Sequence, residues 1–371
     1  MDTFSKYQRQ MLLKNFGQEQ QQKLFDARVL VVGAGGLGCP ALLYLAAAGV
    51  GTLGIVDFDT VEISNLHRQV LYNENDIGKS KAIVAAEKIS QQFLDTDVEI
   101  FNVALTKENA LEIISSFDLL IDGSDNFSTR YLLNDACVLL NKPLVYGSVY
   151  CYEGQLAVFN FTKNKITSTN YRDLFPTPPK ENEIPNCSEA GVLGVLPGII
   201  GTMQANEAIK IITGIGGPLI NKMLTYNSLD NSFYELMLEK NPVAICPATE
   251  TAFLNTVYEL SCTSKKIEEI NAKEFIDLMK TAPANTLLVD VRDDYELPRM
   301  EEYPCLSIPM YELESRLDEL KDAKQIILFC ETGTRSKAAA SILQNKTASS
   351  LYTLKGGMNE FIKNKKAATN A

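Results

Sequence analysis

The sequence has no pair of cysteines at the C-x-x-C spacing and only one histidine, His67. A zinc site of four clustered thiolates is therefore excluded. No apolar run reaches the ~20 residues that a membrane-spanning helix requires, because glycine and proline interrupt even the run at 192–200. The first ten residues, MDTFSKYQRQ, lack the succession of basic, apolar and small residues that marks a secretion signal. These absences favour a cytoplasmic protein.

The chain also lacks an excess of positive charge, since its net charge is −11. Non-specific binding to nucleic acid depends on a basic surface that releases counterions from phosphates, so this charge disfavours it. Eight cysteines without a secretion signal indicate reduced thiols, some of them catalytic, rather than a disulfide framework. A chain of 371 residues, 46% of them apolar, exceeds the usual size of one hydrophobic core and predicts two globular domains.

Segments with strand and helix character alternate through the first part of the chain. Residues 7–24 have apolar side chains at helical spacing and predict an amphipathic helix or helix pair. Strands are then expected at 27–32, 52–59, 98–101 and 118–123, with helices at 40–48, 79–92 and 107–115. This alternation predicts an α/β fold with a Rossmann-like, doubly wound parallel sheet that carries helices on both faces.

The pattern changes after residue 143. Strands are expected at 144–150, 153–161, 222–229 and 232–238, with a helix at 204–214 and a long Pro-, Asn- and Glu-rich loop at 171–191. A second, smaller α/β pattern has strands at 286–292, 325–330 and 350–354 and helices at 311–320 and 336–345. Because periodicity is lost between 241 and 266, we predict a first domain at 1–250, a linker at 251–266 and a second domain at 267–371.

A glycine turn lies between the first strand and the helix that follows it. Gly33, Gly35 and Gly38 form the G-x-G-x-x-G pattern, which lets backbone N–H groups approach a phosphate at the positive end of a helix. Asp57 and Asp59, at the end of the next strand, stand where a ribose hydroxyl is recognised. The pattern indicates a class of ligand and not a reaction, because it suits an NAD-dependent oxidoreductase equally well.

The segments SNLHRQ (64–69) and IGKSKA (77–82) favour phosphoryl chemistry. Arg68, Lys79 and Lys81 supply cations to phosphate oxygens on which negative charge builds as pyrophosphate leaves. Hydride transfer to nicotinamide has little use for such cations. Asp122 and Asp125 follow a further strand, at the edge where open sheets bind ligands. Either carboxylate can hold magnesium, and Asp125 is the first choice.

Five longer motifs carry a family resemblance: YQRQ, VLVVGAGGLGCPALLYLAAAGVG, SNLHRQVL, DGSDNFSTRYLLNDAC and CSEAGVLGVLPGIIG. Over roughly 7–238 they resemble the MoeB/ThiF family of adenylyltransferases, which are similar to ubiquitin-activating enzymes. The resemblance implies that the C-terminal carboxylate of a ubiquitin-like sulfur carrier ending in Gly-Gly attacks the α-phosphate of ATP. It further implies ATP and magnesium positions at Gly36, Asp57, Asn65, Arg68, Lys81, Asp125 and Asn126. Arg9 matches an arginine that, in such homodimers, reaches into the partner's site.

The chain departs from this family where the family usually binds zinc. The C-x-x-C before LFP is replaced by NYRD (170–173), and the region of the second cysteine pair keeps only Cys246. We therefore expect no zinc. Packing or hydrogen bonds must then hold this part of the chain.

The stretch CETGTRS (330–336) directly follows a buried strand. Gly333 permits a tight turn and Arg335 opens a helix, so a ring of backbone N–H groups is expected to stabilise an anionic persulfide on Cys330. LLVDVRDDYE, CETGTRS and LKGGMNEF resemble the motifs of rhodanese, whose persulfide-carrying residue Cys330 matches. The segment EEYPCLSIP departs from that family, which has a His and a Gly-Ala there. A buried structural cysteine is the alternative for Cys330.

The remaining single residues receive simpler assignments. Cys187, in the loop before SEAGVLG, matches by resemblance the cysteine that forms a thioester or acyl disulfide with the carrier. Cys39, Cys137 and Cys305 are assigned to packing. His67 is expected to be a polar neighbour of Arg68 and not a general base, because attack by an ionised carboxylate requires none.

These observations predict adenylation of the carrier's terminal Gly, followed by sulfur transfer from a Cys330 persulfide. Arg335, Cys187, Arg68 and Asp125 are the other expected catalytic residues. ATP and Mg²⁺ are the expected cofactors. The expected partners are the carrier and a persulfide donor such as a cysteine desulfurase. The enzyme is expected to be a homodimer that binds neither nucleic acid nor membrane. A molybdopterin-type pathway is slightly favoured over thiamine or tRNA thiolation. The alternatives of other classes are an NAD-dependent oxidoreductase with a regulatory thiol domain and a non-catalytic scaffold that docks the carrier.

Overall fold

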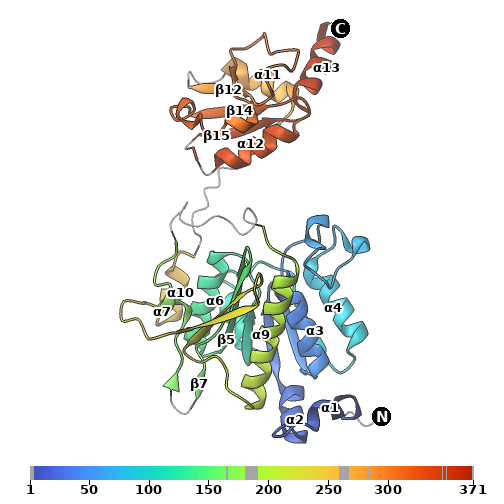
Figure 1. Cartoon of the computed structure of the whole chain (residues 1–371), viewed down its shortest axis with the longest axis vertical. Coiled ribbons are helices and arrows are strands. Elements are labelled where there is room, and N and C mark those ends of the chain that lie inside the picture. The colour runs from blue at the N-terminus through green and yellow to red at the C-terminus, as the bar shows by residue number, and fades with distance from the viewer. Residues whose placement is uncertain are drawn as a thin grey trace. The chain divides into compact units, whose positions relative to one another are not determined.

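A computed structural model describes residues 4–163, 166–179, 191–258, 267–281, 285–344, 346–347 and 349–369. The chain divides into two compact units, Met1–Leu260 and Ser261–Ala371 (Figure 1). The predicted linker at 251–266 overlaps the first unit, because helix α10 (Glu250–Asn255) inserts the fully buried ring of Phe253 into that unit's core. Among the helices that are described, none combines the length and hydropathy needed to cross a bilayer.

The first unit is built on an eight-stranded sheet with the order β10-β9-β6-β5-β4-β1-β2-β3. The five strands from β5 to β3 run parallel, and β6, β9 and β10 continue the sheet in antiparallel register. The strands are β1 (Arg28–Val32), β2 (Thr52–Val56), β3 (Asp97–Phe101), β4 (Leu119–Asp122), β5 (Leu144–Tyr150), β6 (Glu153–Phe159), β9 (Lys222–Asn227) and β10 (Ser232–Met237). A separate two-stranded ribbon pairs β7 (Thr162–Lys163) with β8 (Ile166–Thr167).

Helices cover both faces of this sheet, as the alternation in the sequence predicts. Val29 and Val31 face one core with α3 and α9, while Leu30 and Val32 face the other core with α5 and α6. Burial on both faces explains why β1 reads as a continuous apolar run. The helices are α1 (Gln8–Met11), α2 (Gln18–Asp26), α3 (Gly38–Ala48), α4 (Lys81–Gln92), α5 (Ala110–Ser115), α6 (Phe127–Leu140), α7 (Tyr171–Leu174) and α9 (Val195–Thr213), with 3₁₀ turns at Ser5–Tyr7, Ile63–Asn65 and Glu74–Asp76.

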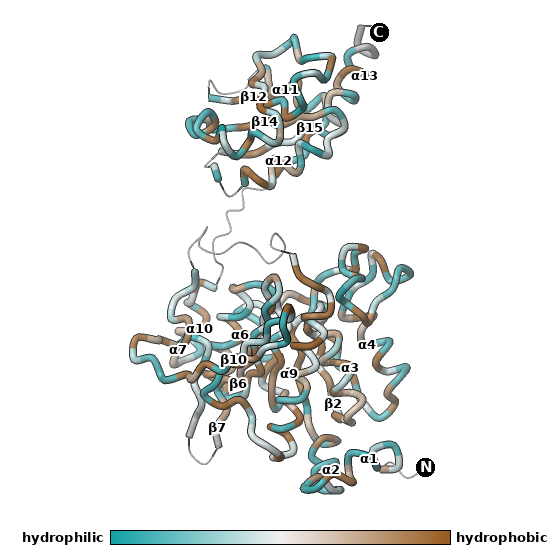
Figure 2. Tube along the Cα trace, in the orientation of Figure 1, coloured by the Kyte–Doolittle hydropathy of each residue, from teal (hydrophilic) through white to brown (hydrophobic). Residues whose placement is uncertain are grey.

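The second unit has a five-stranded parallel sheet with the order β11-β15-β14-β12-β13. Its strands are β11 (Glu268–Ile270), β12 (Thr286–Asp290), β13 (Leu306–Ser307), β14 (Gln325–Phe329) and β15 (Ser350–Leu354). Its helices are α11 (Ala272–Thr281), α12 (Thr334–Gln344) and α13 (Gly357–Thr369). Leu328 packs with α12 on one face, whereas Phe329 packs with α11 and α13 on the other. In both units hydrophobic residues run through the strands and hydrophilic residues gather in outer loops (Figure 2).

One predicted helix is wrong. Residues 311–320 form two 3₁₀ turns, Met310–Glu312 and Leu317–Glu319, instead of one α-helix. The segment is tied down at two buried leucines, Leu313 and Leu320, and Arg316 donates to the carbonyl of Ser307 on β13 at 3.0 Å. These tertiary anchors override the helical spacing of the apolar residues.

Candidate active sites

The glycine turn joins β1 to α3 by a close approach of backbone to backbone. Gly33 has φ +93°, and a Cβ there would lie 2.6 Å from the carbonyl oxygen of Gly123, after β4. A Cβ on Gly38 would lie 1.9 Å from the carbonyl oxygen of Gly33. Both positions therefore require glycine, and the turn lies pressed against the end of β4.

A cleft of about 520 Å³ opens beside this turn, at the carboxyl ends of the parallel strands. It is lined by these residues predicted from the sequence: Gly33, Gly35, Gly36, Asp57, Asp59, Arg68, Lys81, Asp125 and Asn126. Five other predicted residues do not line it: Asp122 and Lys79, which are described below, and three more. Gly38 begins α3 beneath the turn, Asn65 is buried and its side chain accepts from the Glu62 amide, and Arg9 is exposed on α1.

Two carboxylates from the end of β2 organise one wall of the cleft. Asp57 accepts from the amides of Ala34 and Asp59 at 2.7 and 2.8 Å, while its burial raises the pKa of this carboxyl. Asp59 is half exposed and pairs with the buried ammonium of Lys81 at 2.9 Å. Asp57 is thus fixed to the glycine turn, and Lys81 is held at the edge of the cleft where it can meet a phosphate.

The two aspartates after β4 differ in how free they are. Asp122 is fully buried, with Oδ1 accepting from the amide and hydroxyl of Ser124 and Oδ2 lying 3.3 Å from Nε of Arg130. Asp125 is exposed on the cleft wall, and no ion pair holds its carboxylate within the described residues. A cation in the cleft would therefore find Asp125 available and Asp122 occupied, which supports the preference for Asp125.

Arg130, on α6, is a cleft residue to which the sequence analysis gave no role. Its guanidinium is buried, pairs with Asp122 and lies 5.0 Å from the centre of the Tyr146 ring. Burial acts to lower its pKa, but Tyr146 and Asp122 raise it overall. The signal available in the sequence was an arginine on an apolar helix, about two helical turns after the aspartate that ends β4.

Arg68 and His67 behave as the sequence predicts. Nη1 of Arg68 donates to the Ser64 carbonyl at 3.0 Å and lies 2.9 Å from Nε2 of His67. Arg68 lines the cleft, and the histidine is a polar neighbour that contacts its guanidinium. By contrast Lys79 lies outside the cleft wall, 3.8 Å from Asp76.

The cysteine loop forms the second candidate site, at the carboxyl end of β14. The Gly333 amide donates to Sγ of Cys330 at 3.1 Å, and Gly333 has φ +94°. The Ser336 hydroxyl donates to the Gly333 carbonyl at 3.0 Å, which closes the loop onto the first turn of α12. Only 1% of Cys330 is exposed. A backbone amide therefore faces the sulfur, as an anionic persulfide requires.

Arg335 does not point a free charge at this sulfur. Its two terminal nitrogens donate to both carboxylate oxygens of Glu296 at 2.6 Å, in a bidentate pair. The hydrogen bonds from Arg335 lower the pKa of Glu296 to about 2. This pair ties the loop after β12 to α12.

The Glu296 pair leads to a pH-dependent prediction. A carboxyl whose pKa is about 2 when folded and near 4.5 when unfolded stabilises the fold above pH 4.5, and this contribution disappears as pH falls toward 2. The thermal midpoint of Glu296→Gln should therefore lie below that of the natural chain above pH 4.5, and the gap should narrow as the solution is acidified. Thermal melts of both chains, followed by circular dichroism, measure this difference in midpoint at each pH. A gap that is constant with pH would contradict the assignment.

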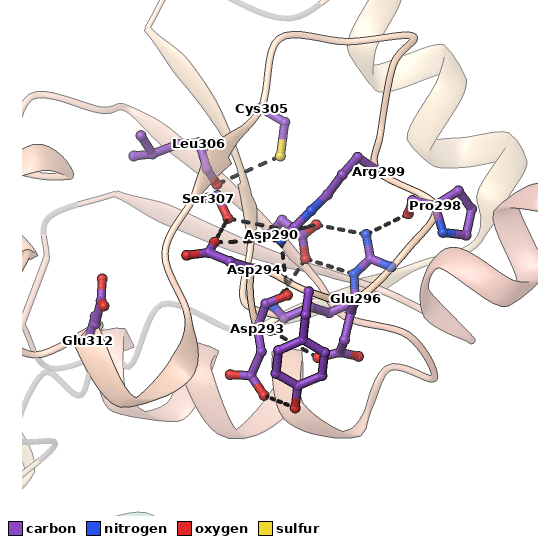
Figure 3. A network of polar contacts seen from close by, with 12 residues as sticks. Asp290, Asp293, Asp294, Glu296, Pro298, Arg299, Cys305, Leu306, Ser307 and Glu312 are labelled. Atoms are coloured by element: carbon purple, nitrogen blue, oxygen red, sulfur yellow. Dashed lines mark hydrogen bonds and ion pairs between the residues drawn. The ribbon is translucent and has the colours of Figure 1, made fainter.

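A buried network holds the segment that departs from rhodanese. Asp290, at the end of β12, accepts from Nε and Nη2 of Arg292 and from Nη1 of Arg299, all within 2.8–2.9 Å. Ser307 donates to Asp294 at 3.3 Å across the same network (Figure 3). Cys305 is partly buried beside Leu306, with its thiol 3.7 Å from that residue's carbonyl oxygen. Within this segment it is Ser307 that joins the polar network, through Asp294 and Arg299.

The other described cysteines are either buried or, like Cys151 and Cys246, partly buried. Cys39 and Cys137 are fully buried, in agreement with a packing role, and burial raises the pKa of Cys39 to about 12. Cys187, the predicted carrier-linked thiol, lies outside the described residues.

A network of hydrogen bonds and ion pairs occupies the region of the missing zinc ligands. Arg172 makes a bidentate pair with the fully buried Asp135, both bonds at 2.7 Å. Asp173 accepts from the Asn241 amide at 2.9 Å, and the Cys246 thiol donates to Asn170 at 3.5 Å. The NYRD motif therefore uses its own side chains to join α7, α6 and the segment after β10.

Removing Arg172 should destabilise the first unit strongly. Arg172→Ala leaves the Asp135 carboxylate buried without a cation, a change that costs about 3–5 kcal/mol. Urea unfolding followed by circular dichroism measures the loss. Lys240 is the matched control, since it pairs with Asp173 at 3.3 Å but is more than half exposed, and Lys240→Ala should cost about 1 kcal/mol or less. Similar losses for both variants would contradict this account of the network.

Comparison with known proteins agrees with this geometry. A model described as ThiF family matches residues 7–248, and a model described as rhodanese-like domain matches residues 271–364. The chain belongs to the ThiF family. The ThiF match contains the cleft, and the rhodanese-like match contains Cys330.

Relatives extend the likeness over nearly the whole chain. It is 49% identical over 263 residues to the sulfur carrier protein adenylyltransferase of Thermus thermophilus, covering 70% of this chain and 97% of that protein. It is 39% identical over 360 residues to the probable adenylyltransferase/sulfurtransferase MoeZ of Mycobacterium tuberculosis, with 95% and 91% covered. MOCS3 of Anopheles gambiae, an adenylyltransferase and sulfurtransferase, is 38% identical over 389 residues, with 98% and 87% covered.

A solved structure supports the fold of the ThiF unit. The crystal structure of E. coli MccB with ATP aligns with a TM-score of 0.57 at 21% identity, covering 65% of this chain and 74% of that one. The relatives and the family matches above, and not this structure, make the ThiF-family chain an adenylyltransferase and sulfurtransferase rather than an oxidoreductase or a passive scaffold.

Proposed function

We propose that this enzyme uses ATP and Mg²⁺ to adenylate the C-terminal glycine of a ubiquitin-like sulfur carrier and then converts it to a thiocarboxylate, in a molybdopterin-type pathway. The observation that carries the proposal is the convergence of Arg68, Lys81 and Asp125 on one cleft beside the glycine turn. Two cations and a free carboxylate suit a triphosphate with its metal better than they suit nicotinamide.

The glycine turn and three side chains of the cleft have parts in the proposed first step. The amides of the glycine turn and the ammonium of Lys81 bind phosphate oxygens, and Arg68 neutralises the charge that builds as pyrophosphate leaves. Asp125 would hold Mg²⁺, which supplies further positive charge to the phosphates when bound. A carboxylate oxygen of the carrier attacks the α-phosphorus of ATP. A new oxygen–phosphorus bond forms as the bond between the α-phosphorus and pyrophosphate breaks.

The second step uses the cysteine loop. The terminal sulfur of a Cys330 persulfide attacks the acyl carbon, and AMP leaves with the electron pair of the broken acyl–oxygen bond. The product is an acyl disulfide between carrier and Cys330. A thiol, from Cys187 or from a small reductant, then attacks the Cys330 sulfur, so the carrier departs as a thiocarboxylate and the thiol becomes disulfide-bonded to Cys330.

Carrier-dependent exchange of labelled pyrophosphate into ATP tests the proposed function. The adenylating enzyme should show exchange only when the carrier is present, because the reverse reaction needs the acyl-adenylate. Absence of exchange with a Gly-Gly carrier of the molybdopterin, thiamine and tRNA-thiolation classes would overturn the proposal. Exchange with another class than the molybdopterin one would keep the chemistry and change the pathway.

Arg9 is proposed to complete the site of a partner subunit, since it is exposed on α1 and does not line the cleft of its own chain. Arg9→Ala and Asp125→Ala should each lack exchange activity, but co-expression should restore it. At random pairing half of the dimers are mixed and each has one intact site, which predicts about a quarter of natural activity. No recovery in purified mixed dimers would contradict a shared site.

A further inference from the structure

The second unit keeps its large apolar side chains inside, with one local exception. Among its described residues, the exposed large hydrophobic side chains are Tyr295, Leu297 and Tyr311, which are 80%, 79% and 75% exposed. We call these three residues the rim patch. Scattered single hydrophobic residues on a surface need no explanation. In this unit, however, all three of these exposed large hydrophobic residues lie on two neighbouring loops, and such a grouping requires an explanation.

The rim patch borders the cysteine loop. The patch residues follow β12 and β13, and Cys330 follows β14, so all lie at the carboxyl edge of one parallel sheet. Tyr295 and Leu297 flank Glu296, whose carboxylate is held by Arg335 on the first turn of α12 at 2.6 Å. Because the two loops are joined directly, a protein bound to the patch is in position to reach the sulfur.

Backbone contacts connect the third member of the patch to the same edge. The amide of Val291, after β12, donates to the carbonyl of Phe329 at 3.1 Å, next to Cys330 in the chain. The amide of Met310 donates to the Val291 carbonyl at 3.2 Å, which places Tyr311 on the loop adjoining the end of β12. Desolvation raises the pKa of the Tyr311 hydroxyl, and the nearby carboxylates of Glu312, Asp293 and Asp294 raise it further. The Tyr311 ring therefore lies among acidic groups.

The charge around the rim patch is negative. Arginines on this edge are each paired with a carboxylate, in the pairs Arg292–Asp290, Arg299–Asp294, Arg316–Glu312 and Arg335–Glu296. Asp293 and Glu331 have no cationic partner within the described residues, and Asp293 accepts from the Tyr295 hydroxyl at 2.9 Å. Figure 3 shows Asp293, Asp294 and Glu296 gathered beside Asp290. An apolar patch with an acidic border is complementary to a partner with apolar and basic side chains.

Resting on the function proposed above, we propose that the rim patch docks the protein that loads Cys330 with sulfur, a persulfide donor with a basic, partly apolar face. The carrier is the less fitting occupant, because its terminus must reach the nucleotide cleft of the first unit, whereas the donor needs only Cys330. Since 1% of Cys330 is exposed, the donor must carry its persulfide on a protruding segment that enters the loop.

The loading step is an exchange without net oxidation. The Cys330 thiolate attacks the outer sulfur of the donor's cysteine persulfide, the donor's S–S bond breaks, and the donor cysteine leaves as a thiolate. The transferred sulfur, with its proton or its charge, remains on Cys330. A small persulfide performs the same exchange without a docking surface, and this difference makes the proposal testable.

The experiment compares protein and small-molecule donors on the full chain. A cysteine desulfurase loaded with radioactive sulfur from cysteine is the protein donor, and glutathione persulfide is the small one. In the variant Tyr295→Ser, Leu297→Ser, Tyr311→Ser, transfer from the desulfurase should fall about tenfold or more in kcat/KM, while loading by glutathione persulfide stays within about twofold. Val257→Ser, an equally exposed apolar residue of the first unit, is the matched control.

Three results would overturn the docking surface. The first is transfer from the desulfurase to the variant at the natural rate, and the second is no transfer from the desulfurase to the natural chain. The third is an equal loss of transfer with both donors, which would mean that the patch maintains the structure of the cysteine loop. Pyrophosphate exchange keeps this test separate from the proposed function. A docking defect with normal exchange supports both proposals, whereas a docking defect in a chain that never shows exchange overturns only the adenylation.

Discussion

Replacing Cys330 with alanine is expected to abolish thiocarboxylate formation while pyrophosphate exchange continues at the natural rate. In the proposed function the two steps use different atoms: exchange needs the cleft beside the glycine turn, and only sulfur transfer needs the Cys330 thiol, whose sulfur accepts a hydrogen bond from the Gly333 amide. Cys330 lies in the second unit's core, where the smaller side chain of alanine leaves a cavity. The stability of Cys330→Ala must therefore be measured alongside its activity.

Cys330→Ser is the control for that loss. It keeps the size and the hydrogen bond to Gly333 but is a far weaker nucleophile, so it should be as inactive in sulfur transfer as the alanine variant. Thiocarboxylate production by either variant, with a persulfide donor and at the natural rate, would contradict the role of Cys330.

Replacing Asp125 with alanine is expected to abolish pyrophosphate exchange. Its carboxylate is exposed on the cleft wall and no ion pair holds it within the described residues, whereas Asp57 is held by the amides of Ala34 and Asp59 and Asp122 is committed to Arg130 and Ser124. Loss of the metal's charge at the phosphates should lower the exchange rate by about 10²-fold or more. Initial rates at saturating ATP and carrier measure the effect.

The exposed position of Asp125 makes this variant a clean probe, because its removal leaves no buried group without a partner. Thermal stability should therefore remain close to natural. Asp230→Ala, another exposed acidic residue but outside the cleft, is the control and should exchange at the natural rate. Exchange by Asp125→Ala at the control's rate would remove Asp125 from the metal site.

The sequence predicted the parts of the fold that local patterns determine. The N-terminal helix pair, the glycine turn, the parallel strands of the first unit and strands β12, β14 and β15 of the second appear where apolar runs and glycines indicated, whereas β11 and β13 were not predicted. Helices α6, α7, α10, α11 and α13 were not among the predicted elements. α6 combines apolar residues with buried polar ones, Arg130, Asn134 and Asp135, whose partners lie on other segments. Such a helix has no clear polar face to read from sequence.

The candidate site was predictable to a similar extent. Motif spacing identified Asp57, Arg68, Lys81 and Asp125 as neighbours in space, and the cleft brings them together. It did not reveal that Asp122 is consumed by Arg130, because that pair depends on a side chain returning from α6 to the strand end. Nor did it reveal the rim patch, since loops after different strands become neighbours only through the register of the sheet.

The segment in which the family usually has its zinc ligands shows the same limit. The sequence indicated that the usual cysteines are absent, and it called for packing or hydrogen bonds in their place. The pair that the structure shows there, Arg172 with Asp135, joins residues far apart in the chain and depends on a side chain of α6. Only the folded structure pairs the two positions.

The mass of the carrier after reaction tests the central claim most directly. The carrier should be incubated with ATP, Mg²⁺ and enzyme whose Cys330 has been loaded with sulfur, then reduced and analysed as an intact protein. The account predicts one sulfur in place of one oxygen at the terminal glycine, and no change when ATP is omitted. An unmodified carrier in the complete reaction, or sulfur incorporated without ATP, would contradict it.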